Sequence, residues 1–128
     1  MPYAMGSGAI KGTVVSGLGE GKYFMSIPHY KNEIRKKLGF DPYPGTFNIK
    51  PENRHDLGKS RSISIDGFEK SGKKFGGASC YIASINRIKG AIIIPDINKH
   101  KGIIEFIAPE HLKSRLKLDD GDEVTIMF

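Results

Sequence analysis

Short stretches of alternating or continuous apolar residues follow one another along most of this 128-residue chain. They predict β-strands over residues 9–16, 22–27, 46–50, 61–65, 75–85, 88–95, 103–107 and 123–128. The longest apolar run, from Ala91 to Ile94, is typical of a buried strand. Turn pairs such as Ser71-Gly72 and Asp120-Gly121 separate the strands, so the pattern predicts a mainly β protein built as a small β-barrel.

Two segments have the periodicity of helices instead. Residues 29–38 carry apolar side chains at four-residue spacing and end before Gly39. Residues 109–116 begin with a proline and a glutamate and carry basic residues towards their end, which is the distribution that the helix dipole favours. We expect these two short helices to cap the barrel. Because strands and helices do not alternate, the pattern disfavours a doubly wound sheet.

The length of the chain is that of one domain. Residues 1–8 lack the apolar segment of a secretion signal, and we expect a flexible lead-in there. Residues 9–128 contain no internal repeat or low-complexity linker, so we expect them to form a single domain. The single cysteine, Cys80, excludes an intramolecular disulfide and fits the reducing cytoplasm, where we expect the protein to be located.

Charge and hydropathy narrow the choice of partners. The chain has 20 Lys and Arg residues against 14 Asp and Glu, a formal net charge of +6. Since the basic residues are dispersed, they indicate attraction for phosphate groups in general and disfavour nucleic acid as the partner. No apolar run approaches the roughly 18 residues needed to cross a bilayer, so we expect no membrane partner.

A polar pair follows the Pro-Gly turn at residues 44–45. If Thr46 begins a strand, Thr46 and Asn48 lie on one face and Phe47 and Ile49 on the other. Two neighbouring neutral oxygen ligands suit a hard cation such as Mg²⁺ that also binds nucleotide phosphates. The alternative is the polar face of an ordinary strand, which the spacing alone favours.

Residues 17–22 carry glycines at three alternate positions and end in Lys22. Such a segment can turn sharply and bring its N–H groups close to an anion, and the lysine would add a positive charge for phosphates. The spacing matches neither the Walker A motif nor the dinucleotide fingerprint. A flexible hairpin connection is the alternative.

Glu105 is the best carboxylate candidate, because it is a lone acid in the apolar segment 103–107. If it faces the barrel, burial would raise its pKa towards that of a useful base; if it faces water, it is the polar half of an alternating strand. The polar loop 96–102 before it is either a substrate lid or a plain connection. The four histidines form no zinc-binding cluster and no nucleophile elbow is present. Phosphate binding, a metal and one carboxylate suffice for phosphoryl transfer.

Several segments resemble the archaeal CTP-dependent riboflavin kinases, in the same order and at similar spacing. They are residues 15–24, 39–50 with the motif PGTFN, 90–95, 107–109 and 118–124. The resemblance covers nearly everything from Gly12 to the C-terminus. It implies a six-stranded cradle-loop β-barrel of the riboflavin-kinase type. It also implies that the γ-phosphate of CTP is transferred to the ribityl 5′-hydroxyl of riboflavin, giving FMN and CDP.

The resemblance also assigns roles to individual positions. Thr46 and Asn48 would coordinate Mg²⁺, and Asn48 and Glu105 would be catalytic. Glu105 matches a flavin-contacting glutamate, and Asn98 lies where the family has a flavin-contacting threonine, in a loop that is one residue shorter. The nucleotide would contact Gly17, Leu18, Gly19, Glu20, Gly21, Lys22, Glu110, His111, Leu112 and Lys113. We expect a monomer whose partners are riboflavin and CTP.

Two other functions fit parts of the sequence. Transcription-factor-type barrels that bind nucleic acid share the architecture and the Leu-x-x-Asp-Gly-Asp ending, but carry no PGTxN segment. A flavin- or nucleotide-binding protein without catalysis would keep the glycine-rich segment and yield no FMN. Tyr43 or Phe47 could stack on the isoalloxazine ring, although a core position is more typical for Phe47.

Overall fold

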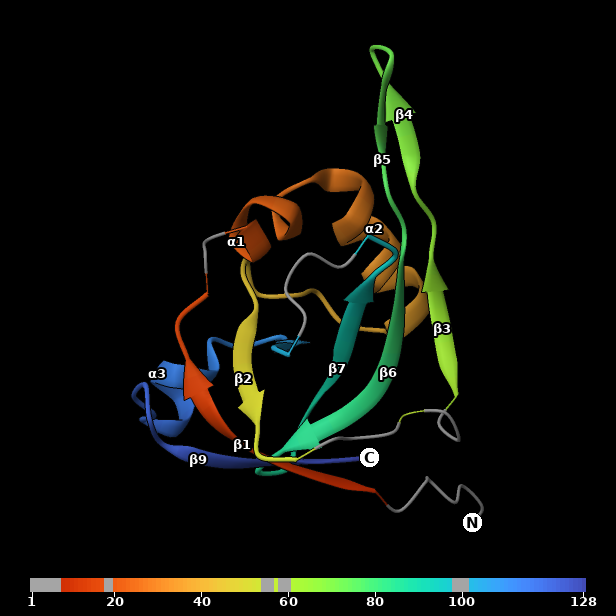
Figure 1. Cartoon of the computed structure of the whole chain (residues 1–128). Helices are drawn as coiled ribbons and strands as arrows, with labels where there is room; N and C mark the ends of the chain where they lie inside the picture. The colour runs from red at the N-terminus through yellow and green to blue at the C-terminus, as the bar shows by residue number, and fades with distance from the viewer. Residues whose placement is uncertain (1–7, 18–19, 54–56, 58–60, 98–101) are drawn as a thin grey trace.

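The alternating segments form the wall of a barrel in the computed structural model, which describes residues 8–128 except 18–19, 54–56, 58–60 and 98–101 (Figure 1). The described strands are β1 (Ala9–Val15), β2 (Phe47–Pro51), β3 (Ser62–Ile65), β4 (Phe68–Lys70), β5 (Lys73–Phe75), β6 (Ala78–Ile85), β7 (Ile88–Pro95), β8 (Ile104–Ile107) and β9 (Glu123–Met127). The described helices are α1 (Glu20–Met25), α2 (Pro28–Leu38) and α3 (Leu112–Leu116). None of these helices is long and apolar enough to cross a bilayer.

The main sheet closes on itself. Its order is β3-β6-β7-β8-β2-β1-β9, and β6 also pairs with β9, so six antiparallel strands complete a barrel while β3 extends the edge of β6. Residues Gly8 and Phe128 exchange two backbone hydrogen bonds of 2.8 and 2.9 Å, so these two positions lie side by side. The predicted six-stranded β-barrel is confirmed.

Two apolar clusters hold this barrel together. The interior is filled by side chains from every barrel strand, among them the fully buried Val14, Ile49, Phe106 and Ile126. Phe106 packs over β7, where a Cβ at Gly90 would lie 2.7 Å from its ring. Close packing of this kind explains why a strand of the barrel carries a glycine in mid-element.

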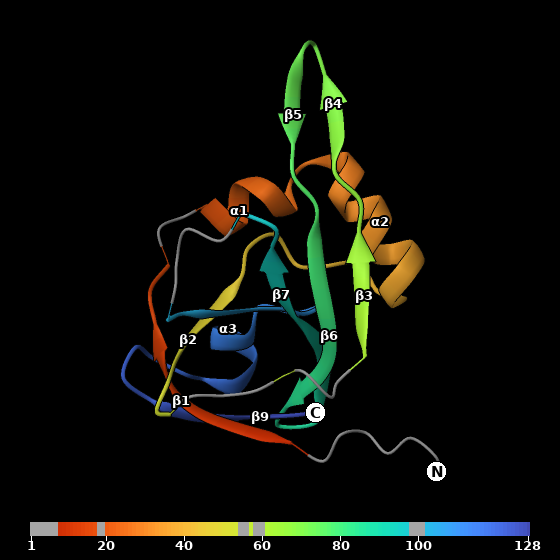
Figure 2. The same cartoon turned by 45° about the vertical axis from the view of Figure 1, so that its right-hand side comes forward.

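The second cluster lies on the outer face of β6 and β7, which α2 covers (Figures 1 and 2). Tyr30, Ile34 and Leu38 of α2 are buried there, as their four-residue spacing predicted. Because β7 is covered on both faces, its apolar run is continuous rather than alternating. Cys80 is buried in this cluster, and burial raises the pKa of its thiol to about 12, so it stays protonated at neutral pH.

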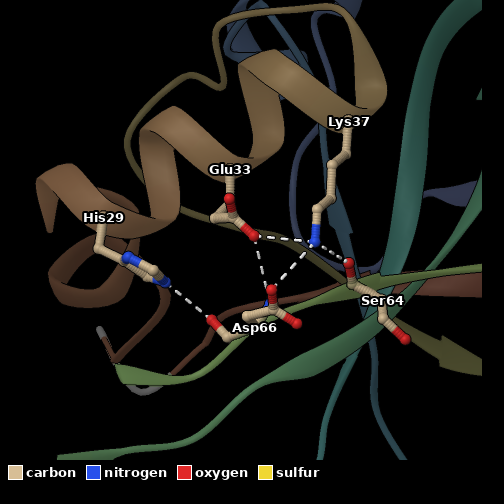
Figure 3. Close-up of polar contacts among 5 residues, drawn as sticks. All are labelled: His29, Glu33, Lys37, Ser64 and Asp66. Carbon is tan, nitrogen blue, oxygen red and sulfur yellow. Dashed lines mark hydrogen bonds and ion pairs between the residues drawn. The ribbon is translucent and has the colours of Figure 1, made fainter. Parts of the chain in front are cut away.

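A network of polar side chains fastens α2 to the connection between β3 and β4 (Figure 3). Lys37 Nζ lies 2.9 Å from Glu33 Oε1 and 3.5 Å from Asp66 Oδ2, and it also donates to the carbonyl oxygen of Ser64. The Nε2 atom of His29 lies 2.8 Å from the carbonyl oxygen of Asp66. The hydrogen bond from Lys37 lowers the pKa of Glu33, and the hydrogen bond to Glu33 raises that of Lys37. The helix is therefore held at its start and near its end.

Three sequence predictions differ from the structure. Residues 22–27 were predicted as a strand, but they belong to helix α1 and the turn that follows it, so the described part of the chain has three helices rather than two. The predicted strand 75–85 is interrupted at Gly76-Gly77, where the chain passes from the projecting β4–β5 hairpin into the barrel (Figure 2). At Gly77 a Cβ would lie 2.4 Å from the carbonyl oxygen of Ile65, so the close approach of two backbones ends the strand there. The predicted helix 109–116 begins only at Leu112.

Candidate functional site

A cavity of about 300 Å³ opens where the end of β1, the start of β2 and the start of α3 meet. Figure 1 shows these three elements on the same side of the barrel. The cavity is lined by Val15, Ser16, Gly17, Lys22, Tyr43, Pro44, Gly45, Thr46, Phe47, Asn48, Phe106, Ala108, Glu110, His111, Leu112 and Lys113. Segments that are almost a hundred residues apart therefore share one pocket.

The polar pair of β2 lies at this cavity as the period of a strand predicts. Phe47 and Ile49 are buried in the barrel core, while Thr46 and Asn48 are half-buried. The Oγ1 atom of Thr46 lies 3.0 Å from Oδ1 of Asn48 and 3.3 Å from Oε1 of Glu105. A hydroxyl, a carboxamide and a carboxylate thus meet in one place.

Glu105 enters this group from the neighbouring strand. In the register of β2 and β8 it pairs with Asn48, and its neighbours Ile104 and Phe106 point into the barrel core. Its side chain therefore lies on the outer face of the barrel and is half-buried. This position is intermediate between the two that the sequence left open, a buried side chain that faces the barrel and a side chain that faces water. The carboxylate is close enough to share a ligand or an ion with Thr46 and Asn48.

The chemistry of these donors fits a hard divalent cation. All three groups offer oxygen, and two of them are neutral, which suits an ion that keeps waters and shares phosphate oxygens. Among the described residues, no group of three or more His, Cys, Asp and Glu side chains could hold a metal on its own. An ion at this position would therefore have to be held by the Thr46 and Asn48 oxygens together with the phosphate oxygens of a bound substrate.

Gly17 packs directly against the carboxamide of this group. A Cβ at Gly17 would lie only 2.2 Å from Nδ2 of Asn48. The φ angle of Gly17 is not in the left-handed region, so any effect of a larger residue here would come from this contact, which would push the Asn48 carboxamide aside. Lys22, on α1, lines the same cavity.

The rest of the predicted glycine-rich loop is only partly visible. Leu18 and Gly19 lie outside the described residues. Glu20 and Gly21 belong to the first turn of α1, so the predicted loop ends in a helix. Asn98, the predicted flavin contact, also lies outside the described residues.

The start of α3 forms the opposite wall. Glu110, His111, Leu112 and Lys113 all line the cavity, as their predicted common role requires. The ring of Tyr43 stacks on that of His111, with centroids 5.0 Å apart and planes at 29°. The backbone of Tyr43 is fixed, because its N–H donates to the carbonyl oxygen of Ala108, and the residue is 43% exposed. The cavity thus has an aromatic wall made by Tyr43 and His111, whereas the sequence suggested Tyr43 only as a residue that stacks on the isoalloxazine ring.

A carboxylate that the sequence assigned only to a turn reaches the cavity wall. Lys113 Nζ donates to Asp120 Oδ1 at 2.7 Å, and the hydroxyl of Ser16 donates to Asp120 Oδ2. These two partners lower the pKa of Asp120, with Lys113 contributing most. Sequence analysis missed the link because residues 16, 113 and 120 meet only in the folded barrel.

Comparison with known proteins places this geometry in a family. The family model "CTP-dep_RFKase", described as "Domain of unknown function DUF120", matches residues 14–128. The riboflavin kinase of Saccharolobus solfataricus is 46% identical over 125 residues, which cover 91% of this chain and 71% of that protein. The riboflavin kinase of Methanocella arvoryzae is 42% identical, with 94% of this chain and 57% of that protein covered.

A third relative, the riboflavin kinase of Pyrococcus abyssi, is 45% identical over 128 residues. That match covers 96% of this chain and 59% of the relative, so the chain spans little more than half the length of some of its curated relatives. The family match extends from β1 to the end of the chain and includes every described segment that lines the cavity. The chain belongs to the family of CTP-dependent riboflavin kinases.

Proposed function

We propose that this protein is a riboflavin kinase that transfers the γ-phosphate of CTP to the ribityl 5′-hydroxyl of riboflavin, giving FMN and CDP. The observation that carries the proposal is the single cavity in which Gly17 and Lys22 face the same space as Thr46 and Asn48. Phosphate-binding groups and potential metal ligands must be neighbours for phosphoryl transfer. The names of the relatives supply riboflavin, and the name of the family supplies CTP.

Mg²⁺ would be held by the Thr46 hydroxyl and the Asn48 carboxamide oxygen. When bound, such an ion neutralises charge on the nucleotide phosphates. Lys22 and Lys113 line the cavity and add positive charge for the same phosphates. Gly17 carries no side chain of its own, which would let a phosphate approach its backbone closely. Together these groups bind and orient the triphosphate.

Glu105 would receive the proton of the reaction. The riboflavin oxygen forms a bond to the γ-phosphorus while the bond between that phosphorus and the β–γ bridging oxygen breaks, and CDP leaves with the electron pair. The hydroxyl proton passes to the Glu105 carboxylate, which lies beside Thr46 and Asn48. Positioning of the hydroxyl in line with the leaving group supplies most of the acceleration.

The aromatic wall suits the base of the nucleotide. Tyr43 and His111 present stacked rings, and a pyrimidine that stacks on an exposed aromatic ring gains about 1–3 kcal/mol. In this proposal the base lies near the start of α3 and the phosphates lie near Gly17 and Asn48. Asn98 as a flavin contact, a monomeric state and a cytoplasmic location remain predictions.

A direct assay tests the function. Purified protein is incubated with riboflavin, Mg²⁺ and either CTP or ATP, and the flavins are separated by chromatography with fluorescence detection. We expect FMN and CDP in equal amounts, faster with CTP than with ATP, and no product when the metal is chelated. The variant Asn48→Ala should lose activity by about 100-fold or more, since it removes a predicted metal ligand. Asp66→Asn, which changes an exposed carboxylate on the α2 side of the molecule, is the matched control.

The same preparation separates the alternatives. Saturable nucleotide binding without FMN formation would identify a binding protein that does not catalyse phosphoryl transfer. Binding to a DNA duplex that weakens steeply with salt would identify a nucleic-acid-binding barrel instead.

A further inference from the structure

Asp120 connects three parts of the chain at the wall of the cavity. Its carboxylate accepts hydrogen bonds from Lys113 on α3 and from Ser16, which follows β1. Both donors line the cavity. Asp120 itself belongs to the connection between α3 and β9, which passes beside β1 in Figure 1.

The backbone around Asp120 is fixed independently of its side chain. The N–H of Gly121 donates to the carbonyl oxygen of Val14 at 2.8 Å, and the N–H of Val14 donates to that of Asp122 at 2.9 Å. The N–H of Asp119 donates to the carboxylate of Asp122 at 2.8 Å. Since these bonds hold the turn, the Asp120 side chain is free to serve another purpose than turn formation.

We propose that Asp120 is a positioning residue of the nucleotide site, which holds the Lys113 ammonium and the Ser16 hydroxyl in place for the incoming nucleotide. The inference rests on the proposed function, because it takes the cavity to be the nucleotide site. Asp120 acts through its two partners and touches no substrate itself.

The donor and acceptor capacities of the three groups support this role. An ammonium group has three N–H donors, so Lys113 can stay on Asp120 while it donates to a nucleotide oxygen. Ser16 donates its only proton to Asp120, so towards the cavity its oxygen can only accept. Asp120 therefore makes Lys113 the donor and Ser16 the acceptor of the pair, which suits a phosphate oxygen for the lysine and a hydroxyl or amine of the nucleotide for the serine.

Two physical effects of Asp120 have opposite signs. A lysine that is already ordered loses less side-chain freedom when the nucleotide binds, which favours binding. A carboxylate near the phosphates repels them, which disfavours binding. The Lys113 and Asp120 side chains are 35% and 50% exposed, so water screens the repulsion. We therefore expect positioning to outweigh repulsion.

Steady-state kinetics of Asp120→Asn and Asp120→Ala test the proposal through the sign of the change. The KM for CTP should rise by about 5- to 20-fold in the alanine variant, the effect of one lost charge-assisted hydrogen bond, and by less in the asparagine variant, whose oxygen still accepts. The KM for riboflavin and kcat should stay within about threefold of the wild type. Asp66→Asn, which also removes a carboxylate near a lysine, should leave all three constants unchanged.

A double-mutant cycle distinguishes positioning from a general structural role. If Asp120 acts through Lys113, adding Asp120→Asn to Lys113→Gln should raise the KM for CTP little further. Equal unfolding temperatures of the single variants exclude misfolding. Should the aspartate variants not fold, Ser16→Ala and Lys113→Gln test the two contacts separately, and each must raise the KM for CTP.

Other results would overturn the proposal. An unchanged or lowered KM for CTP in the aspartate variants would assign Asp120 to repulsion or to the turn alone, and additive effects in the cycle would separate it from Lys113. Were the wild type to form no FMN, the proposed function would fail, and calorimetry with Mg-CTP would replace the KM. Tighter CTP binding by the wild type than by Asp120→Asn, and by Asp120→Asn than by Asp120→Ala, would then still support a positioning role. A wild type that binds no CTP would refute that role.

Discussion

Asn48 is the residue on which the candidate site converges. Its carboxamide oxygen meets the Thr46 hydroxyl, its strand partner is Glu105, and its nitrogen packs against the bare backbone of Gly17. These contacts come from the residue that precedes β2, from β8 and from the segment that follows β1. A small displacement of one carboxamide would therefore disturb the predicted metal ligands, the predicted base and the phosphate-binding backbone together.

Replacing Gly17 with alanine tests this arrangement. The added Cβ would lie 2.2 Å from Asn48 Nδ2, so the carboxamide must turn away from Thr46. Misplacement of a catalytic group by about 1 Å commonly lowers turnover by about 100-fold, and we expect a loss of that order in kcat/KM with CTP. At Gly76 a Cβ would meet no atom within 4 Å, so Gly76→Ala is the matched control and should remain active. Full activity of Gly17→Ala would show that the site tolerates a displaced carboxamide.

Glu105→Gln separates a base from a simple contact. The substitution keeps the size of the side chain and removes its charge. As a base, Glu105 should contribute about 100- to 10,000-fold, so kcat should fall within that range while the KM for riboflavin changes little. Steady-state kinetics with riboflavin varied at saturating CTP give both constants. A loss confined to riboflavin affinity would reduce Glu105 to a binding contact.

At the scale of elements, the sequence predicts strands better than it predicts the segment before α2. Strand parity is a local property, and it correctly predicted that Phe47 and Ile49 lie in the core while the Thr46 and Asn48 side chains lie together outside it, although β2 begins only at Phe47. Tyr23 and Phe24 favour strands by propensity, yet they lie exposed on α1 while Met25 is buried next to α2. Packing against α2 decides this conformation, and no local pattern reports that contact.

The polar network of α2 has a pH dependence that can be measured. The pKa of Glu33 is lowered from its usual 4.5, chiefly by the hydrogen bond from Lys37. A lowered folded-state pKa means that the contribution to stability is complete above the unfolded pKa and is lost as the pH falls through the folded pKa. Glu33→Gln should therefore lower the unfolding temperature by a few degrees at most near pH 7, and this difference should shrink as the pH falls into the acid range where Glu33 becomes protonated in the folded state.

Thermal unfolding over this pH range, followed by circular dichroism, gives the comparison. Lys37→Met should show the same dependence, because it removes the partner of the same carboxylate. A difference between wild type and Glu33→Gln that persists at the lowest pH would contradict an electrostatic origin.

For the whole molecule, the pairing of strands that are distant in sequence assembles the site. The pairing of β1 with β9 brings the connection before β9 against β1. The cavity is lined by residues at the end of β1, around the start of β2 and at the start of α3, and Asp120 of that connection contacts two of them. The role that we infer for Asp120 depends on a contact between residues 16, 113 and 120, which no sequence spacing reveals. The sequence could predict the strands and the two polar motifs, but it could not predict how the pairing of distant strands brings these motifs together.

Because the cavity is lined by segments that meet only in the folded chain, a bound nucleotide should stabilise the fold. At a concentration 100 times its dissociation constant, a ligand adds about 2.7 kcal/mol, or a rise of roughly 10 °C for a chain of this size. We expect Mg-CTP to produce this shift in a thermal melt. In Asn48→Ala the part of the shift that depends on Mg²⁺ should disappear. No shift with Mg-CTP at millimolar concentration would argue against the cavity as the nucleotide site.

The backbone pairing of Gly8 with Phe128 means that a short peptide linker could join these positions without bending the barrel. New ends could then be opened at Ser71-Gly72, the tip of the hairpin that projects from the barrel beyond α2 (Figure 2). Such a circular permutant keeps every wall of the cavity on an uncut stretch of chain. It should therefore make FMN at a rate close to that of the original order of residues.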